Sequence, residues 1–329
     1  LEKGLKSISL SANWMWPCKY EGEDARLYKA VEAVSKFAID LGINVPTGKD
    51  SLSMVQKYAD EKVFAPGTVI VSAAGHCNNV RQVVEPVLQA DKGEIIYINI
   101  SGVQHQLGGS SFAQTQNRLG DKAPSIAEAS EFAHIFDTVQ KAVKADMIAA
   151  GHDIGSGGLI TTLLELCFAD NDLGANVDLG VIDDEDLVKV LFAENCGIVL
   201  QSADDRLADL LHESNIQFYT LGMPNIAGKL NLTTPSDEVI ALDIKEMRDI
   251  WYETSFLLDQ KQTANNLAKN RFDNYKAQPL TFKFPEHFTG DLPPVGAKKP
   301  IAAIVREKGS NSEREMANAL FRAGFEVRD

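Results

Sequence analysis

Apolar and polar residues recur with two different periods along the first part of the chain, and these periods predict its secondary structure. Over residues 23–41 apolar side chains return every three or four positions, which predicts a helix with one buried face. Gly42 follows at the position where a glycine often ends a helix. Runs rich in β-branched residues predict strands at 7–10, at 43–46 and, as a buried strand, at 68–74. We therefore expect residues 1–85 to form the later part of an α/β domain.

A second alternation of strands and helices begins near Gly93. The apolar runs predict strands at 94–100 and 193–201, and helices at 126–150, 157–170 and 204–215. This α/β alternation continues to about residue 235 and predicts a second unit over 86–235.

The last part of the chain changes character twice. Residues 245–270 predict a helix-rich connector, and the stretch 278–299, rich in proline and lysine, predicts a linker. Residues 300–329 predict a fresh β–α–β unit with a helix at about 312–323.

Composition narrows the class of protein. A chain of 329 residues is expected to hold two or more domains. With 46 acidic and 32 basic residues the formal charge is −14, and no Lys/Arg cluster with interleaved aromatics offsets it, so we expect no binding to nucleic acid. No apolar run approaches the ~18 residues that a membrane-spanning helix needs, so we expect no membrane role.

The cysteines indicate a reducing cytoplasm. They are widely separated and show no CxxC spacing, so neither a structural zinc site nor a disulfide framework is expected. The four are Cys18, Cys77, Cys167 and Cys196.

Both ends predict a piece of a longer protein. The chain opens with Leu1 and has neither an initiator Met nor a signal peptide. It stops at Asp329, within an expected strand.

A polar segment at 47–51 is a first candidate for chemistry. Thr47-Gly48-Lys49-Asp50-Ser51 follows an expected strand and combines a glycine, a cation, a carboxylate and a hydroxyl. Such a loop can approach a phosphate and hold a cation beside a metal ligand. It lacks the GxxxxGK[ST] spacing of a Walker A loop, and an ordinary polar turn is an equal alternative.

A second candidate is the glycine-rich segment 151–158, expected between two helices. Its glycines would direct amides toward a helix N-terminus, which attracts anions, and Asp153 would bind a magnesium that bridges phosphate oxygens. A helix cap and turn would give the same composition, so that alternative stays open.

Three further polar residues have open roles. His152 could act as a general base, although a structural histidine is the commoner case. Glu194 and Asn195 lie at the edge of an expected buried strand, where a structural hydrogen bond to a neighbouring loop is slightly favoured. An aromatic set is expected to serve packing rather than base stacking: Trp14, Trp16, Trp251 and Tyr252.

The motifs become specific in combination. They are SANWMW at 11–16, GEDARLY at 22–28, PTGKDSLSM at 46–54, HDIGSGGL at 152–159 and REKGSNSEREMANALFRAGF at 306–325. Their order and spacing resemble, over essentially the whole chain, the second half of the synthetase region of the large single-chain phosphoribosylformylglycinamidine synthases, followed by the start of their glutaminase domain.

The resemblance implies an α/β (α+β) fold of aminoimidazole-ribonucleotide-synthetase-like domains. Residues 1–85 would be most of a second A-type domain, and 86–235 the second B-type domain. Residues 236–299 would be a helical connector and linker, and 300–329 the first β–α–β of a class I glutaminase domain.

The resemblance also implies an activity. The family is a ligase of purine biosynthesis that converts formylglycinamide ribonucleotide, ATP and glutamine into the amidine, ADP, phosphate and glutamate, with Mg²⁺ as cofactor. The glutaminase nucleophile would lie beyond Asp329, and half of the synthetase site would come from another part of the same polypeptide. We therefore expect this piece to be inactive and to bind Mg-ADP weakly or not at all.

Site residues carry over by position. Gly48 would touch ATP, Ser51 would contact the ribonucleotide, and Lys49 stands where small-subunit relatives have a metal-binding Asn. Asp153 matches a magnesium ligand of an auxiliary nucleotide site. Gly155 replaces a nucleotide-contacting Ser, so only a backbone contact is expected there.

Two other hypotheses remain. The chain could be another ATP-binding member of the superfamily, although those enzymes lack a glutaminase-like tail. It could also be a non-catalytic scaffold piece with empty glycine loops.

Overall fold

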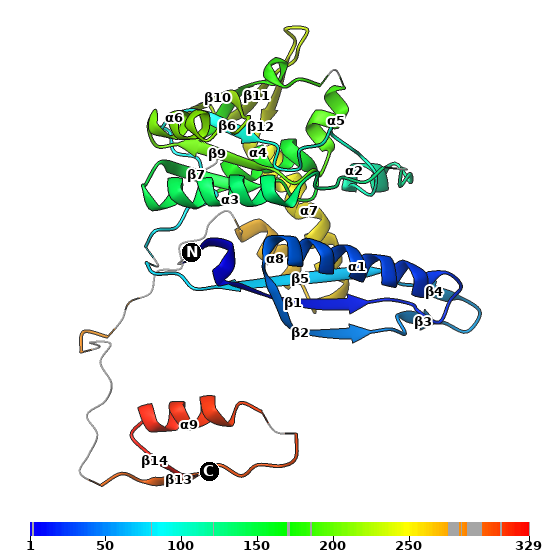
Figure 1. Ribbon diagram of the computed structural model, residues 1–329, viewed down its shortest axis with the longest axis vertical. Coiled ribbons are helices and arrows are strands. Elements are labelled where there is room, and N and C mark those ends of the chain that lie inside the picture. The colour runs from blue at the N-terminus through cyan, green and yellow to red at the C-terminus, as the bar shows by residue number, and fades with distance from the viewer. Residues whose placement is uncertain are drawn as a thin grey trace. The chain divides into compact units, whose positions relative to one another are not determined.

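The computed structural model divides into two compact units, Leu1–Gln262 and Thr263–Asp329, each of which is described by itself (Figure 1). The described residues are 1, 3–79, 81–120, 122–169, 172–184, 186–275, 283, 285–287, 298–309 and 311–328. No helix among them is long and apolar enough to cross a membrane.

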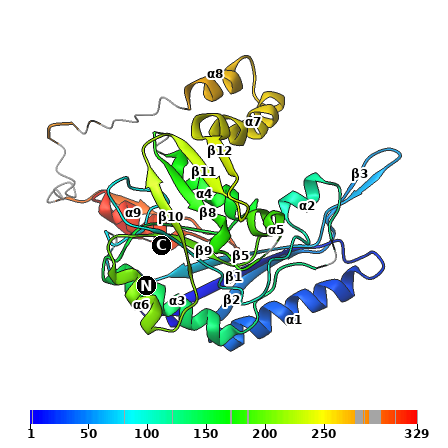
Figure 2. The same ribbon diagram turned by 90° about the horizontal axis from the view of Figure 1, so that it is seen from above.

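The N-terminal part of the first unit contains a three-stranded sheet in the order β2-β1-β5. Strand β1 pairs in parallel with β2 and antiparallel with β5, and helix α1 lies along the sheet (Figures 1 and 2). The bounds are η1 (Gly4–Ser7), β1 (Ile8–Met15), α1 (Glu23–Leu41), β2 (Asn44–Ser51) and β5 (Thr68–Gly75), with a small hairpin of β3 (Val55–Lys57) and β4 (Lys62–Phe64).

The expected helix at 23–41 is confirmed, and Gly42 ends it with a left-handed φ of 69°. Two expected loops are wrong, however. Residues 11–15 and 47–51 are the paired parts of β1 and β2, in register from Ser11↔Thr47 to Met15↔Ser51. Hydrogen bonding to a parallel neighbour here overrides the polar local composition, which favoured a turn.

Strand β5 is confirmed as a strand but is not buried. Ile70 is 52% exposed and Val71 is 44% exposed. The apolar run correctly predicts extended backbone, yet burial depends on which elements cover the strand, and the described residues leave these side chains open.

A seven-stranded sheet forms the larger part of the first unit, in the order β12-β11-β8-β10-β6-β9-β7. Its strands are antiparallel to their neighbours except for the parallel pair β11 and β8. Their bounds are β6 (Ile95–Ile98), β7 (Ile148–Asp153), β8 (Gly174–Asp178), β9 (Ile198–Ser202), β10 (Tyr219–Asn225), β11 (Lys229–Thr233) and β12 (Val239–Asp243).

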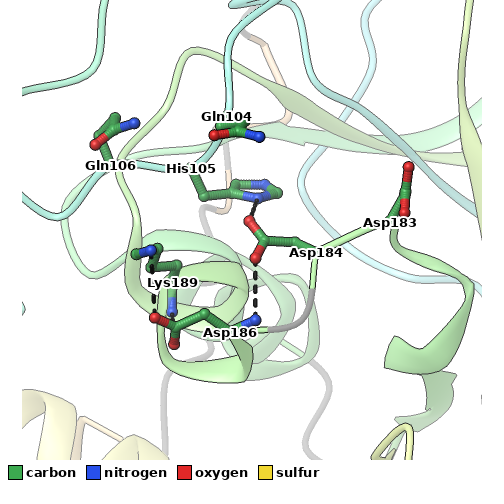
Figure 3. A pocket seen from close by; sticks show the side chains of 7 residues that line it. All are labelled: Gln104, His105, Gln106, Asp183, Asp184, Asp186 and Lys189. Carbon is green, nitrogen blue, oxygen red and sulfur yellow. Dashed lines mark hydrogen bonds and ion pairs between the residues drawn. The ribbon is translucent and has the colours of Figure 1, made fainter.

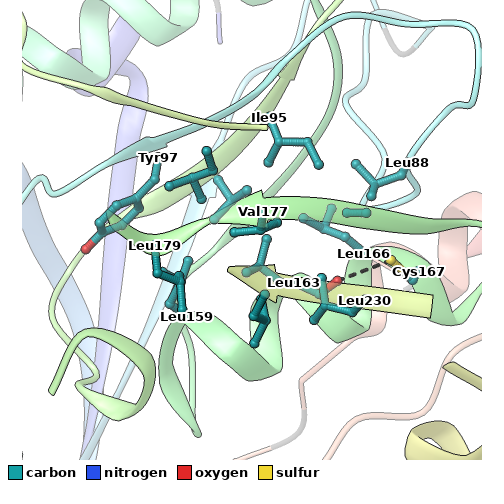
Figure 4. Packing of buried hydrophobic residues seen from close by; sticks show 14 of the residues in the cluster. Leu88, Ile95, Tyr97, Leu159, Leu163, Leu166, Cys167, Val177, Leu179 and Leu230 are labelled. Carbon is teal, nitrogen blue, oxygen red and sulfur yellow. Dashed lines mark hydrogen bonds between the residues drawn. The ribbon is translucent and has the colours of Figure 1, made fainter. Parts of the chain in front are cut away.

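Strand β6 supplies side chains to both cores of this sheet. Ile95 and Tyr97 belong to one hydrophobic cluster, while Ile96 and Ile98 belong to the other, as the two-residue period of a strand requires. The larger cluster includes residues of helices α4 and α5, and Figure 4 shows Leu159, Leu163 and Leu166 of α4 turned toward the strands. The smaller cluster is covered by α3 and α6.

The helices of this part are α2 (Ser111–Thr115), α3 (Ala129–Lys144), α4 (Gly158–Phe168), η2 (Leu179–Val181), α5 (Leu187–Phe192), α6 (Arg206–Glu213) and α7 (Ile244–Gln262). The expected helix at 126–150 is too long, because α3 ends at Lys144, Asp146 takes a left-handed φ of 52°, and β7 follows. The glycine-rich segment 151–158 therefore joins a strand to a helix, not two helices.

Two other expected boundaries change. Residues 193–197 precede β9 instead of belonging to it. The sheet continues through β12 to Asp243, so the expected domain end at residue 235 falls inside it.

The expected aromatic set does not form one cluster. Trp16 is buried, with Arg26 5.9 Å from its ring, whereas Trp251 packs against Phe168 and Tyr252. Both environments agree with a packing role.

The second unit contains α8 (Leu267–Asn274), β13 (Ile301–Ala303), α9 (Glu313–Arg322) and β14 (Glu326–Arg328). Strands β13 and β14 are parallel, as expected for a β–α–β unit. The expected linker at 278–299 lies almost wholly outside the described residues.

Candidate functional site

The turn between β7 and α4 carries the candidate Asp153. Its course is set by packing as well as by composition: Gly157 and Gly158 have left-handed φ values of 92° and 75°. A Cβ on Gly158 would lie 2.6 Å from the carbonyl oxygen of Leu191, at the end of α5. A Cβ on Gly155 would meet no atom within 4 Å, so Gly155 alone faces open space.

Glu194 occupies the N-terminal end of α4. Its Oε1 accepts the backbone N–H groups of Gly157 and Ser111, each at 2.8 Å. The N–H of Gly158 is used within the turn, donating to the carbonyl of Gly155 at 3.1 Å. The expectation that these amides attract an external anion is therefore wrong for Gly157 and Gly158, because their N–H groups already have protein partners.

Asn195 holds a neighbouring loop. Its Oδ1 accepts the N–H of Gln106 at 3.0 Å, and its Nδ2 donates to Ser101 Oγ at 3.0 Å and to the carbonyl of Gln104 at 3.2 Å. The side chain is 1% exposed. The structural hydrogen bonds that the sequence slightly favours for Glu194 and Asn195 are thus confirmed.

His152 and Asp153 lie together at the end of β7. His152 Nδ1 is 2.7 Å from the carbonyl oxygen of Asp153, and its Nε2 is 3.3 Å from Glu165 Oε2. Glu165 Oε1 also accepts the indole N–H of Trp251 at 3.0 Å. These contacts explain His152 as a structural residue that links β7, α4 and α7.

Sequence reasoning missed Glu165. A signal was available, because Glu165 is the only charged residue in the otherwise apolar sequence of α4, and a lone charge on an apolar helix usually has a partner.

The carboxylate of Asp153 is free to meet a ligand, with 86% of its side chain exposed. Magnesium is commonly held by one or two carboxylates together with substrate phosphates, and an exposed aspartate at the end of a strand suits that chemistry. Within the described ranges no group of three His, Cys, Asp or Glu residues is placed to hold a metal without such help.

Cys196, near this turn, is not a nucleophile. Burial, and secondarily the charge of Asp153, raise the pKa of its thiol above the usual range. A thiol kept protonated is a poor nucleophile, in agreement with the absence of any cysteine-based arrangement in the sequence.

The second candidate, residues 47–51, lies on strand β2. A Cβ on Gly48 would lie 2.3 Å from the carbonyl oxygen of Ala12, so close strand pairing already requires a glycine there. Lys49 Nζ donates to Ser51 Oγ at 2.6 Å and to the carbonyl of Asp50 at 2.7 Å. Lys49 and Ser51 therefore form one exposed polar pair. The hydrogen bonds of Lys49 stay within β2, and those of the Asp153 turn stay within the larger sheet region.

A pocket of about 490 Å³ contains a polar cluster that the sequence did not single out (Figure 3). His105 Nδ1 lies 3.0 Å from Asp184 Oδ2, and His105 Nε2 lies 3.3 Å from the hydroxyl of Tyr97. Partial burial would raise the pKa of Asp184, but the N–H of Asp186 and the His105 ring outweigh it and hold this pKa below its ordinary value. Lys189, on the same pocket wall, is paired with Asp186 at 3.4 Å. With its charges paired in this way, the pocket has the character of a structural cluster.

Comparison with family models agrees with the two sheets. The FGAR-AT PurM_N-like domain matches residues 2–76, and the C-terminal domain of AIR synthase related proteins matches residues 91–223. The chain thus has the fold of the AIR-synthase-like class, with an N-type and a C-type domain in succession.

Curated relatives narrow the class. Human phosphoribosylformylglycinamidine synthase is 36% identical over 341 residues, which cover 99% of this chain and 25% of the relative. The probable synthase of Arabidopsis thaliana is 32% identical over 340 residues, covering 99% of this chain and 24% of the relative. The chain belongs to the phosphoribosylformylglycinamidine synthase family, and it spans about a quarter of the length of these relatives.

Solved structures share the fold. The structure titled T. maritima PurL complexed with FGAR aligns with a TM-score of 0.54 and 16% identity, covering 73% of this chain and 39% of that one. T. maritima PurL complexed with ATP gives 0.53 and 13%, covering 74% and 38%. The hydrogenase maturation protein HypE in complex with ATP gives 0.52 and 17%, covering 72% and 74%.

Proposed function

We propose that this chain is the part of a phosphoribosylformylglycinamidine synthase that contributes its second pair of synthetase domains. The observation that carries the proposal is the similarity to the human synthase along 99% of the chain. The whole enzyme is an ATP- and glutamine-dependent ligase of purine biosynthesis, which converts formylglycinamide ribonucleotide into formylglycinamidine ribonucleotide.

The domains follow from this assignment. Residues 1–85 form the A-type domain, and the B-type domain begins at 86 and extends through β12 to Asp243 instead of ending at 235. The helical connector and linker then reach residue 299. Residues 300–329, with parallel strands β13 and β14, are the start of a glutaminase domain whose nucleophile is not among the four cysteines of this chain.

Nucleotide binding is assigned to the turn after β7. Asp153 acts as a magnesium ligand, and the backbone of Gly155 contacts ATP or ADP. Two features support these roles: the 86% exposure of the Asp153 side chain, and the open space around Gly155. The phosphates themselves supply the remaining magnesium ligands.

Substrate contacts are assigned to β2. Gly48 and Lys49 contact the nucleotide, and Ser51 contacts formylglycinamide ribonucleotide. The Lys49–Ser51 hydrogen bond of 2.6 Å supports a joint role, since a lysine that shares a proton donor with a serine presents both to the same anionic group. PurL structures that carry ATP, ADP or FGAR in their titles agree with these ligand classes.

The piece by itself is inactive, because the first half of the synthetase site and the glutaminase that releases ammonia from glutamine belong to the rest of the polypeptide. The surroundings are those of the cytoplasm, with no nucleic acid and no membrane as partner.

Titration of the chain with ADP, with and without Mg²⁺, tests the nucleotide assignment. We expect weak, magnesium-dependent binding that Asp153→Ala abolishes and that Asp60→Ala, a change at the exposed tip of the β3–β4 hairpin, leaves unaltered. Tight binding with the same affinity in Asp153→Ala would show that the metal site lies elsewhere.

A further inference from the structure

Glu194 joins two loops that are far apart in the sequence. Its Oε1 accepts the N–H of Ser111, the first residue of α2, and the N–H of Gly157, which directly precedes α4; both distances are 2.8 Å. We call Ser111, Gly157 and Glu194 the Glu194 bridge. One carboxylate oxygen thus connects the loop 107–111 to the turn 154–158.

The bridge supplies a charge that neither helix carries locally. Helix α4 has no acidic residue in its first turn and no side-chain hydrogen bond at its N-cap. Helix α2 also lacks an acidic first-turn residue, and the hydroxyl of its N-cap Ser110 is used for the N–H of Ala113. Unpaired N–H groups at helix starts favour a negative charge, and here Glu194 provides it.

The turn held by the bridge is intrinsically adaptable. Gly155, Gly157 and Gly158 remove side-chain restraints from three of its positions, and glycine has the widest choice of backbone conformations. Its N-terminal end is fixed by the bond from the N–H of Ile154 to the carbonyl of Gly197. At the C-terminal end, the Glu194 bridge fixes Gly157.

The segment around Glu194 holds the second loop by independent contacts. Phe112 of α2 stacks on Phe192 of α5, with ring centroids 4.6 Å apart, and Asn195 binds the backbone of residues 104 and 106. The loop 107–111 is therefore a fixed support, and the bridge transfers its position to the glycine turn.

We propose that Glu194 is a positioning residue, which keeps the 154–158 turn in the arrangement that lets Asp153 and Gly155 receive a magnesium–nucleotide. This inference rests on the proposed function of that turn. It differs from a purely structural role, because it requires that one carboxylate orders both loops and that the order at the turn limits nucleotide affinity.

Hydrogen exchange tests the bridge directly. Glu194→Ala is expected to speed amide exchange in both segments, 107–116 and 154–160, because each loses the same acceptor. Glu194→Gln keeps an acceptor oxygen and is expected to retain most of the protection in both. Glu213→Ala, an exposed carboxylate at the end of α6, is the matched control and should change neither.

Nucleotide affinity, followed by the phosphorus resonances of Mg-ADP, tests the positioning role. Glu194→Ala is expected to weaken binding about tenfold, the size of one lost charged hydrogen bond. Acetate matches the removed CH₂–COO⁻ group, so its addition should restore both the exchange protection and the affinity of Glu194→Ala. An added carboxylate would not restore a variant that had merely lost stability through a different contact.

The outcomes are separable. Faster exchange in only one segment, or in neither, overturns the bridge as a connection between loops. Faster exchange in both with unchanged Mg-ADP affinity overturns the positioning role. If the unmodified chain binds no Mg-ADP while exchange responds in both segments, the proposed nucleotide site fails and the positioning role fails with it, whereas the bridge itself stands.

Discussion

Two strands with similar apolar sequences have opposite environments in this protein. Strand β5 contains Val69, Ile70 and Val71, yet Ile70 is 52% exposed, whereas β6 contains Ile95 and Ile96, both fully buried. The difference lies in the layers around each strand: β6 is central in a seven-stranded sheet with a core on each face, while β5 is an edge strand of three. An apolar run therefore predicts a strand, but only its neighbours decide how much free energy its burial contributes.

The comparison predicts the largest effect in the core beside β6. Leu163 of α4 is fully buried, so Leu163→Ala should lower the free energy of unfolding by about 2–5 kcal/mol, through lost apolar contact and a cavity. Val71→Ala, in β5, should cost under about 1 kcal/mol because its side chain is already 44% exposed. Urea unfolding followed by circular dichroism measures both, and equal losses would contradict the contrast.

A smaller effect is expected at the glycine turn beside this core. Gly158→Ala combines a left-handed φ of 75° with a Cβ placed 2.6 Å from the carbonyl oxygen of Leu191, so it should cost about 2 kcal/mol or more. Gly155→Ala is the matched control, since its Cβ would meet nothing within 4 Å. Thermal unfolding of the two variants decides whether packing against α5, and not glycine content alone, shapes the turn.

The third expected effect depends on pH. The pKa of Asp184 is held below its ordinary value of 3.8, so its ionised form stabilises the fold above that value and the stabilisation is lost as pH falls through the lower, folded pKa. Asp184→Asn should therefore be less stable than the unmodified chain near neutral pH, and the difference should shrink in acid. Unfolding midpoints measured across an acid series would contradict this pairing if the difference stayed constant.

The smallest effect is expected on the open sheet. Lys49 is exposed and bonds only within β2, so Lys49→Met should change the free energy of unfolding by less than about 0.5 kcal/mol. On the proposed function, the same substitution should still weaken substrate binding in the complete enzyme. A large stability loss would show that Lys49 serves the sheet instead.

Local patterns predicted the elements that have local causes. The apolar period of α1 and its Gly42 cap were correct, as were strands β5 and β6 and the β–α–β order of the last residues. The same patterns extended α3 through β7 and treated residues 47–51 as a loop. These errors share one cause, since sheet pairing comes from partners distant in the sequence and local composition does not report it.

For the candidate site, the sequence identified the right segments but not their connections. It located the glycine turn and Asp153, and it favoured hydrogen bonding for Glu194 and Asn195. It did not show that Glu194 reaches both Ser111 and Gly157, nor that His105, Asp184 and Tyr97 meet, because these contacts join residues up to 89 positions apart, as in Asn195 and Gln106.

The sequence by itself therefore determined the class of fold, the order of its domains and the segments suited to a nucleotide, since these depend on periodicity and on short motifs. The tertiary structure decided which strands are buried, which glycines serve packing and which amides remain available. The physical reason is that burial and hydrogen-bond partnership are properties of pairs of segments, and these pairs form only when the chain has folded.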